Sequence, residues 1–136
     1  MRLHYKISEG EEIVQYVDEM SIYPYVCKYF KFPVRHPVIH VGDACLDREA
    51  MLRKEGLIKC CVLPPQRLHH LGVNFRCNDK LFFCLCKSCA TERNADGECA
   101  HETVSESALT GNWIIDEVRL AVQKIYEVIE VFELYY

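Results

Sequence analysis

The chain has 136 residues, of which half are hydrophobic and about a quarter are charged. This length suits one ordinary domain with a modest core, and the composition is that of a globular protein. The net charge of −4 at pH 7 argues against a stand-alone nucleic-acid-binding domain, which is usually basic. No segment approaches the roughly 20 apolar residues that a membrane-spanning helix needs, so we expect no membrane partner.

The nine cysteines are many for a chain of this length. The first ten residues turn polar too soon for a secretory signal, so we expect a reducing intracellular compartment, the nucleus or the cytoplasm. There, an odd number of clustered cysteines indicates metal ligands or buried thiols rather than disulfides. Four of them stand in apolar surroundings and are interpreted as packing residues: Cys27, Cys45, Cys60 and Cys61.

The first third of the chain contains three predicted elements. Apolar residues at alternate positions predict a strand over about 11–18, after an irregular start. Helical spacing of apolar residues then predicts a turn and a short helix within 19–30. Prolines keep residues 32–37 extended or looped. Asp43 is the expected N-cap of a helix over about 44–55, with Gly56 as its stop.

The rest of the chain alternates strands with one further helix. Residues 57–63 are β-rich and end at two prolines, and a loop through Gly72 leads to a strand over about 80–85. The polar region 86–101 is loop-like. A brief strand over 108–113, a helix over 116–124 and a last strand over 127–134 follow. This order indicates an α+β or α/β fold, of which we favour α+β, with Trp113 as a core anchor.

The residues Asp18-x-x-Ser21-x-Tyr23-Pro24 resemble motif A of family B DNA polymerases. The longer run 18–37, with Tyr-Pro-Tyr-Val-x-Lys-Tyr and then Phe-Pro-Val-x-His-Pro, is similar to the protein-primed branch carried by Polinton/Maverick-type transposons and related viruses. The similarity continues through the Cys-rich centre to Glu133.

The resemblance implies a division of the chain into two parts. Residues 1–37 would be a partial polymerase palm, in which a strand delivers motif A. Residues 38–136 would be an insertion-like β/α region with a zinc knuckle and a β-α-β tail, of the kind that lies against the palm and contacts the terminal protein and the template-primer. The implied activity is template-directed addition of deoxynucleotides to a primer.

Motif A would supply groups to a two-metal reaction, in which carboxylates hold two Mg²⁺ ions about 3.5–4 Å apart. The resemblance implies that Asp18 is one of these carboxylates and that the backbone carbonyl of Glu19 is another Mg²⁺ contact. Ser21 and Ile22 would lie under the triphosphate of the dNTP. Tyr23 would be the ring beneath the sugar, where it leaves no room for a 2′-hydroxyl. The implied partners are a DNA template-primer, a dNTP and a terminal priming protein.

Parts of such a polymerase are missing from these residues. We find neither a Lys-x-x-x-Asn-Ser-x-Tyr-Gly fingers motif nor a Tyr-x-Asp-Thr-Asp motif with the second palm carboxylate. Phosphoryl transfer would then lack charge neutralisation, so we expect the isolated chain to be inactive. The family usually has Asn where Cys27 stands, and Gly where Phe30, Arg35 and Ile125 stand. These departures indicate a divergent or decayed copy.

A Cys/His cluster in the centre of the chain predicts a structural zinc site. Cys86-x-x-Cys89 has the knuckle spacing that lets two thiolates bind one Zn²⁺ at about 2.3 Å. Cys99-x-His101 supplies a second pair across an Asn94-Ala-Asp-Gly97 turn, and the same segment recurs in the insertion of the resembling family. Alternatively, both knuckle cysteines are buried small hydrophobes and His101 lies on the surface. A redox role is disfavoured because no helix is expected to start directly after the knuckle.

Two more cysteines compete for the ligand positions. Cys77 and Cys84 are rivals, although Cys84 is interpreted as a core residue of its strand.

Three functions stay open: a polymerase fragment, a non-enzymatic zinc-stabilised binding module derived from a transposon polymerase, and a plain α+β domain with thiols in its core. Zinc content separates the last from the others, and indifference to Asp18→Ala would favour the binding module.

Overall fold

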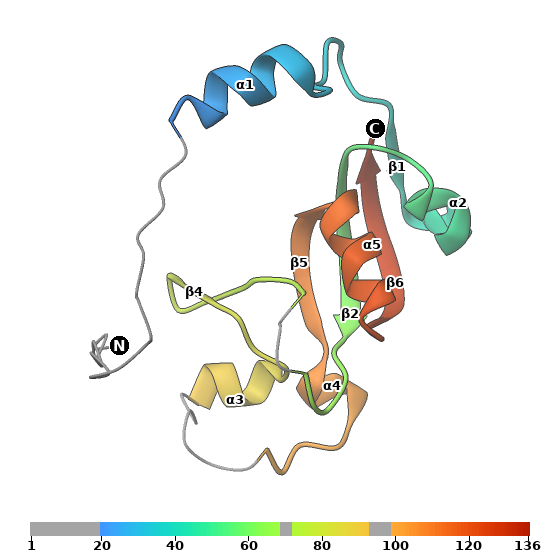
Figure 1. The fold of residues 1–136 in the computed structure, drawn as a ribbon. Coiled ribbons are helices and arrows are strands. Elements are labelled where there is room, and N and C mark those ends of the chain that lie inside the picture. The colour runs from blue at the N-terminus through green and yellow to red at the C-terminus, as the bar shows by residue number, and fades with distance from the viewer. Residues whose placement is uncertain (1–19, 69–71, 93–98) are drawn as a thin grey trace, which may run out of the picture. The chain divides into compact units, whose positions relative to one another are not determined.

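The structure is a computed structural model that describes residues 20–68, 72–92 and 99–136 (Figure 1). The chain divides into two compact units, Met1–Val34 and Arg35–Tyr136. The strand expected over 11–18 lies outside the described residues, and Asp18 and Glu19 lie outside them too. The polymerase identities assigned to 1–37 and 38–136 stay predictions.

The described part of the first unit contains helix α1, Ile22–Tyr29, as expected from the spacing within 19–30. Pro24 is compatible with the first turn because backbone N–H groups there have no helical partner. The helix starts with the Tyr25 N–H donating to the carbonyl of Ser21 at 3.0 Å. No residue of α1 is buried. The interpretation of Cys27 as a packing residue was therefore wrong: its side chain is exposed.

The second unit is built on a four-stranded antiparallel sheet in the order β1-β6-β2-β5. The sequence correctly predicts three of these strands, and the three-residue edge strand β1 was missed. Their bounds are β1 Ile39–Val41, β2 Leu57–Leu63, β5 Leu109–Ile114 and β6 Glu127–Tyr135. The fold is α+β, as expected.

Alternation along the strands places the core on one face of the sheet. Ile58, Cys60 and Val62 of β2 are buried, and the residues between them are only half-buried or exposed. Helix α5, Ile115–Gln123, covers this face (Figure 1) and buries Ile115, Val118 and Ala121. The remaining core positions on the sheet are Leu109, Trp113, Val128, Val131 and Leu134.

The helix expected over 44–55 is shorter and starts later. A 3₁₀ turn, η1, spans Gly42–Cys45, and helix α2 spans Arg48–Leu52. Asp47 caps α2 by accepting from the Ala50 N–H at 3.0 Å, so the prediction of Asp43 as N-cap was wrong. The buried Cys45 explains the break: the chain turns its side chain into the core before the helix can begin.

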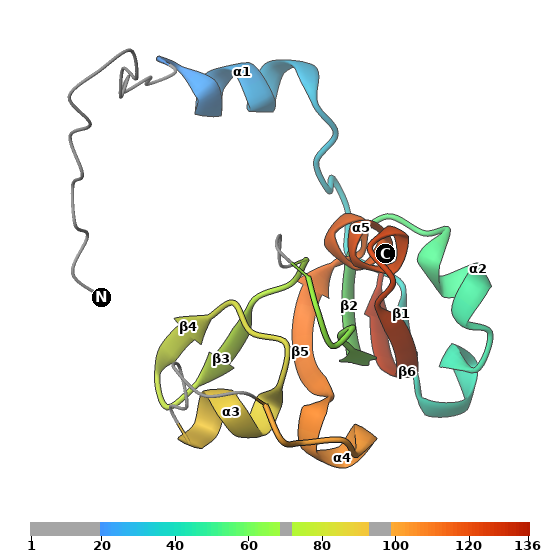
Figure 2. The same ribbon diagram turned by 60° about the horizontal axis from the view of Figure 1, so that its bottom comes forward.

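A separate hairpin lies beside β5 (Figures 1 and 2). Its strands are β3, Phe75–Cys77, and β4, Lys80–Phe82. Asn78 and Asp79 connect them with positive φ angles of 49° and 60°, the conformation of a tight two-residue hairpin turn. The strand predicted over 80–85 thus ends three residues early. The Trp113 ring N–H donates to the Asn74 carbonyl at 2.8 Å and fastens the start of the hairpin to β5.

Two short helices follow the hairpin. Helix α3, Lys87–Glu92, occupies the region expected to be loop-like, and helix α4, Val104–Ser107, precedes β5. Thr103 and Glu106 form a capping box at α4, in which the Thr103 N–H donates to the Glu106 carboxylate at 3.3 Å. Among the described residues, no helix is long and apolar enough to cross a membrane.

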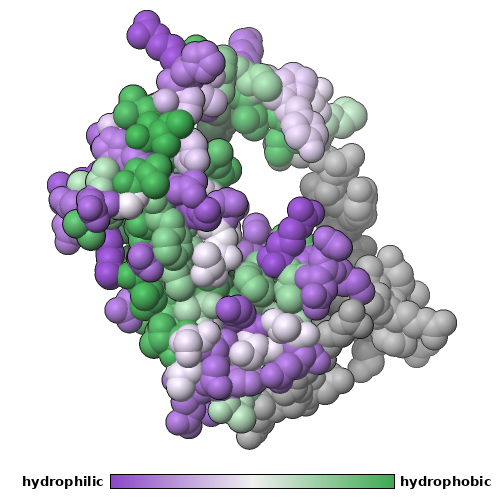
Figure 3. Space-filling view, turned by 180° about the vertical axis from the view of Figure 1, so that it is seen from behind, coloured by the Kyte–Doolittle hydropathy of each residue, from purple (hydrophilic) through white to green (hydrophobic). Residues whose placement is uncertain are grey.

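The face of the sheet opposite α5 mixes apolar and charged residues (Figure 3). One row of paired residues across the four strands is apolar. It consists of Ile39, Tyr135, Leu57 and Ile114. The next row on the same face contains the ion pair of Lys59 with Glu133, at 2.6 Å. Between this row and η1 lies an open hollow of about 600 Å³. Charges of both signs line the hollow and favour no particular class of ligand.

Candidate metal centre

Helix α3 brings the first two ligand candidates together. It starts directly after Cys86, and the Ala90 N–H donates to the Cys86 carbonyl at 3.2 Å. The Cys-x-x-Cys knuckle therefore wraps the first turn of the helix, which puts Cys86 and Cys89 on the same side. The expectation that this region is loop-like was wrong, because α3 begins inside the knuckle. The redox interpretation is weakened instead by the third thiol and the imidazole that meet this pair.

The second pair comes from the segment that leads into α4. The Ser88 hydroxyl of α3 donates to the Glu106 carbonyl at 3.0 Å and holds this segment against the helix. Within the segment, the Ser107 hydroxyl donates to the His101 carbonyl at 3.4 Å. The Cys/His cluster therefore joins α3, which follows the hairpin, to the chain that enters β5.

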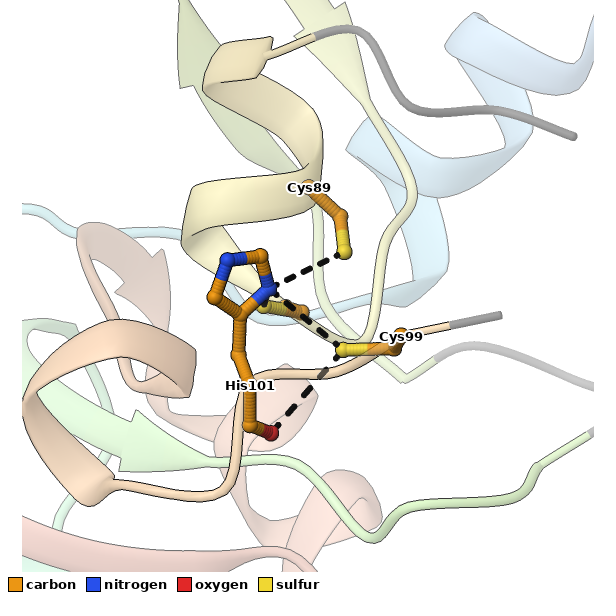
Figure 4. Close-up of side chains that lie close together, drawn as sticks. Cys89, Cys99 and His101 are labelled. Carbon is orange, nitrogen blue, oxygen red and sulfur yellow. Dashed lines mark hydrogen bonds between the residues drawn. The ribbon is translucent and has the colours of Figure 1, made fainter. Parts of the chain in front are cut away.

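The four ligand atoms converge on one point. The Nδ1 atom of His101 lies 3.6 Å from the sulfur of Cys86, 3.4 Å from that of Cys89 and 3.7 Å from that of Cys99. Figure 4 shows the ring with this nitrogen directed at the sulfurs. All four ligand atoms lie within 4.8 Å of one another.

These separations fit ligands that share one zinc ion. With Zn–S of about 2.3 Å and Zn–N of about 2.0–2.1 Å, a tetrahedral site separates nitrogen from sulfur by about 3.6 Å. The three observed distances, 3.4, 3.6 and 3.7 Å, lie around this value. A thiol–imidazole hydrogen bond would explain one such contact, but a single ring nitrogen cannot align with three sulfurs at once. The cluster can hold a metal ion.

The electrostatics of the thiols agree with this conclusion. Burial disfavours the Cys86 thiolate, but hydrogen bonds from the Cys89 backbone, Ser107 and the neighbouring thiols outweigh burial and lower the pKa of Cys86. Burial and hydrogen bonds to Cys99 and Cys86 raise the pKa of Cys89 to about 12. The two shifts have opposite signs although both thiols face the same imidazole nitrogen. A divalent cation would lower the pKa of each thiol, because it stabilises every thiolate that it binds.

The structure also decides between the competing cysteines. Cys77 and Cys84 are not among the four clustered residues. Burial raises the pKa of Cys84 to about 11, and its side chain packs against the core. Its interpretation as a core residue was right, although it follows β4 rather than lying within a strand. All nine cysteines fall in the described part of the chain, and all are free thiols.

The residues assigned to nucleotide binding lie at the start of α1. Ser21 precedes the helix in a left-handed conformation, with φ at 65°, and Ile22 and Tyr23 form its first turn. The Tyr23 side chain is 82% exposed, so it is not a core residue of the described structure. Asp18 and Glu19 cannot be placed relative to these residues, because they fall outside the described ranges.

Sequence reasoning missed one residue beside the cluster. The Nε2 atom of His101 lies 3.7 Å from the Glu92 carboxylate, at the last residue of α3. Its position depends on a helix that the sequence did not predict. With the helix known, the i, i+3 spacing of Cys89 and Glu92 would have indicated that both side chains lie on one face.

Comparisons with family models, curated proteins and solved structures found no match to this chain. Its function must therefore be argued from its own residues.

Proposed function

We propose that Cys86, Cys89, Cys99 and His101 bind one structural Zn²⁺. The observation that carries this proposal is the convergence of three sulfurs on one imidazole nitrogen at 3.4, 3.6 and 3.7 Å. Four protein ligands would complete a tetrahedral shell and leave no position for a substrate, which is typical of structural rather than catalytic zinc. Three thiolates and an imidazole are soft and borderline ligands that favour zinc over Mg²⁺ or Ca²⁺.

The metal would stabilise a part of the fold that has little apolar packing of its own. Lys87, Thr91 and Glu92 of α3 are exposed, and Ala90 is its only buried residue. Zinc binding would cross-link this helix to the segment before α4. A metal that binds only the folded chain adds its binding free energy to the stability of the fold. Removal of zinc should therefore unfold α3 and the segment before α4 first.

Metal content and thermal unfolding test the zinc proposal. We expect one zinc per chain after purification, and a lower melting temperature in a strong chelator. Cys86→Ser should lose the metal, whereas Cys27→Ser, at an exposed cysteine outside the cluster, should retain it. If Cys86→Ser and the unchanged chain bind the same amount of zinc, the proposed ligand set is wrong.

For the chain as a whole, we propose the role of a segment of a protein-primed family B DNA polymerase, containing motif A and the insertion after it. Support comes from the run of residues from Asp18 to Pro37 and from the zinc-type cluster at the expected place. In a complete enzyme, Asp18 would hold Mg²⁺, and the residues from Ser21 to Tyr23 would meet the dNTP.

One backbone angle is consistent with the resemblance at Ile125, although Phe30, at another glycine position of the family, has an ordinary φ angle of −105°. The resembling family has Gly where Ile125 stands, and Ile125 has a φ angle of 68°, in the left-handed region that favours glycine. It follows α5 in a Schellman motif: the Tyr126 N–H donates to the Ala121 carbonyl and the Ile125 N–H to the Val122 carbonyl, both at 3.0 Å. A β-branched residue in this conformation is uncommon, and a glycine ancestor would explain it.

Primer extension tests the polymerase proposal. A chimera would carry residues 18–136 in place of the corresponding segment of a protein-primed polymerase. We expect Mg²⁺-dependent extension that is lost on Asp18→Ala, and increased ribonucleotide use on Tyr23→Val. A folded, zinc-loaded chimera that is inactive, or equally active with Asp18→Ala, would contradict the proposal. The isolated chain should not extend a primer.

A non-enzymatic zinc-stabilised module is the second candidate. The observation that favours it is that unit 35–136 contains its own core and the whole Cys/His cluster. This function predicts that binding to a partner needs zinc but is indifferent to Mg²⁺ and to Asp18→Ala. The chimera assay separates the two, because only the polymerase segment would depend on Asp18.

A further inference from the structure

We propose that Glu92 is a positioning residue of the zinc centre: its carboxylate holds the proton of His101 on Nε2, so that Nδ1 binds the metal. This inference rests on the proposed zinc centre and adds a residue outside the four ligands. It follows from the orientation of the imidazole, the spacing of the ligands and the place of Glu92 on α3.

The orientation of the ring comes first. Its Nδ1 atom faces the sulfurs of Cys89 and Cys99 (Figure 4) and lies 3.6 Å from that of Cys86, whereas its Nε2 atom faces away from them, 3.7 Å from a carboxylate oxygen of Glu92. A neutral imidazole carries its proton on one nitrogen and offers the other as a ligand. Nδ1 binding therefore requires the proton on Nε2, which is the atom that Glu92 faces.

The spacing of the second ligand pair explains why Nδ1 is needed. Cys99 and His101 are separated by one residue, so both side chains must reach the metal from almost the same place on the backbone. Nδ1 is the ring nitrogen nearer to the main chain, and it reaches a nearby ion where Nε2 would overshoot it. The Cys99 sulfur also lies 3.9 Å from the carbonyl oxygen of His101, which confirms how tightly this segment folds back.

Helix α3 places Glu92 next to the ring. Glu92 stands three residues after Cys89, so thiol and carboxylate share a face of the helix. The carboxylate is 60% exposed, whereas the His101 side chain is 18% exposed. The carboxylate therefore stays hydrated and costs little to place near the thiolates, while most of the His101 side chain is shielded from solvent.

The size of the effect follows from this geometry. Carboxylates that accept from the remote N–H of a metal-bound histidine orient the ring and strengthen it as a ligand, and their loss typically costs about 10–100-fold in metal affinity. The separation of 3.7 Å is longer than a direct hydrogen bond, so the contact is weaker than the carboxylate–histidine pairs behind this range. We therefore expect the lower end of this range, about tenfold.

Zinc affinity and imidazole nitrogen NMR together test the proposal on the full chain. Competition with a chromophoric chelator should give about tenfold weaker zinc binding for Glu92→Ala. Glu92→Gln, whose amide oxygen can still accept from Nε2–H, should recover most of the affinity. Glu102→Ala, at an exposed acidic residue next to His101, controls for the loss of one negative charge and should bind zinc as the unchanged chain does.

The ¹⁵N chemical shifts of His101 show which ring nitrogen binds the metal and which carries the proton. A purely structural role of Glu92 would not change them. In the zinc-loaded chain we expect a metal-bound Nδ1 and a protonated Nε2. A metal-bound Nε2, or Glu92→Ala with the affinity of Glu102→Ala, would overturn the role of Glu92 while leaving the zinc centre in place. A chain that binds no zinc would overturn both proposals.

Discussion

Replacing Ile125 by glycine should stabilise the protein, although the change removes an entire apolar side chain. Ile125 has a φ angle of 68° directly after helix α5, where a left-handed residue closes the Schellman motif. For a residue with a Cβ atom this conformation costs about 1–2 kcal/mol. The strain exists only in the folded state, so it lowers the free energy of unfolding directly.

The opposing terms are smaller. Ile125 is 81% exposed, so its side chain buries almost no apolar area that glycine would lose. Glycine increases the conformational entropy of the unfolded chain, which lowers the free energy of unfolding by roughly 0.5–1 kcal/mol. We therefore expect Ile125→Gly to raise the free energy of unfolding by about 0.5–1 kcal/mol, and the melting temperature by about 2–6 °C for a unit of this size.

Urea and thermal unfolding in excess zinc would measure this change, because the metal contribution is then the same in every variant. Gln123→Gly, at the exposed last residue of the same helix, is the matched control and should lose about 0.5–1 kcal/mol. Ile125→Asn should give part of the gain, since asparagine tolerates the left-handed region better. If Ile125→Gly is destabilised as much as Gln123→Gly, the backbone conformation assigned to this residue is wrong.

Two further predictions concern the sheet. Gly56→Ala should lower the free energy of unfolding by about 3 kcal/mol or more, since an added Cβ would lie 2.0 Å from the Tyr135 carbonyl oxygen and Gly56 has a φ angle of 149°. Gly42→Ala is the control: its Cβ would meet nothing within 4 Å, so the same urea titration should show a loss of about 1 kcal/mol. Equal losses would refute the close approach of Gly56 to β6. Hydrogen bonds from Lys59 and Tyr135 lower the pKa of Glu133. These bonds therefore stabilise the fold fully above the usual glutamate pKa of about 4.3, and their contribution is lost as the pH falls through the lowered pKa of Glu133. Glu133→Gln should therefore reduce stability at pH 7 and flatten its decline below about pH 4.3, whereas Glu127→Gln, at an exposed carboxylate of the same strand, should leave the acid unfolding curve unchanged. A Glu133→Gln curve parallel to that of the unchanged chain would count against this pairing.

The sequence predicts the helices and strands in which apolar residues recur with a regular period. Strand β2 spans the predicted residues because Ile58, Cys60 and Val62 alternate with less buried positions, and α5 follows from apolar residues on one helical face. Strands β1 and β3 were not predicted, because three residues are too few for a period to be visible. The Asn78-Asp79 pair was the available signal for the hairpin turn.

The helix around residues 42–52 shows how packing overrides a local signal. Asp43 and Asp47 are equivalent as caps in the sequence, and the structure uses Asp47 because Cys45 turns into the core between them. Burial of a single residue is a tertiary effect, and no local pattern specifies it.

The four clustered Cys and His residues were predictable, whereas Glu92 was not. Ligand spacing is a local property of the chain, so Cys86, Cys89, Cys99 and His101 stand out without a structure. The position of Glu92 depends on where α3 starts and on how the segment after Cys99 returns to it. Residues that orient a ligand are fixed by the fold, and they become visible only when the fold is known.

X-ray absorption at the zinc edge of the metal-loaded chain tests the proposed centre most directly, because it counts the ligand atoms by element. We expect three sulfurs at about 2.3 Å and one nitrogen at about 2.0–2.1 Å. A shell of four sulfurs would mean that Cys77 or Cys84 replaces His101, and a shell of oxygen and nitrogen alone would mean that zinc binds elsewhere. Either result would contradict the assignment of Cys86, Cys89, Cys99 and His101.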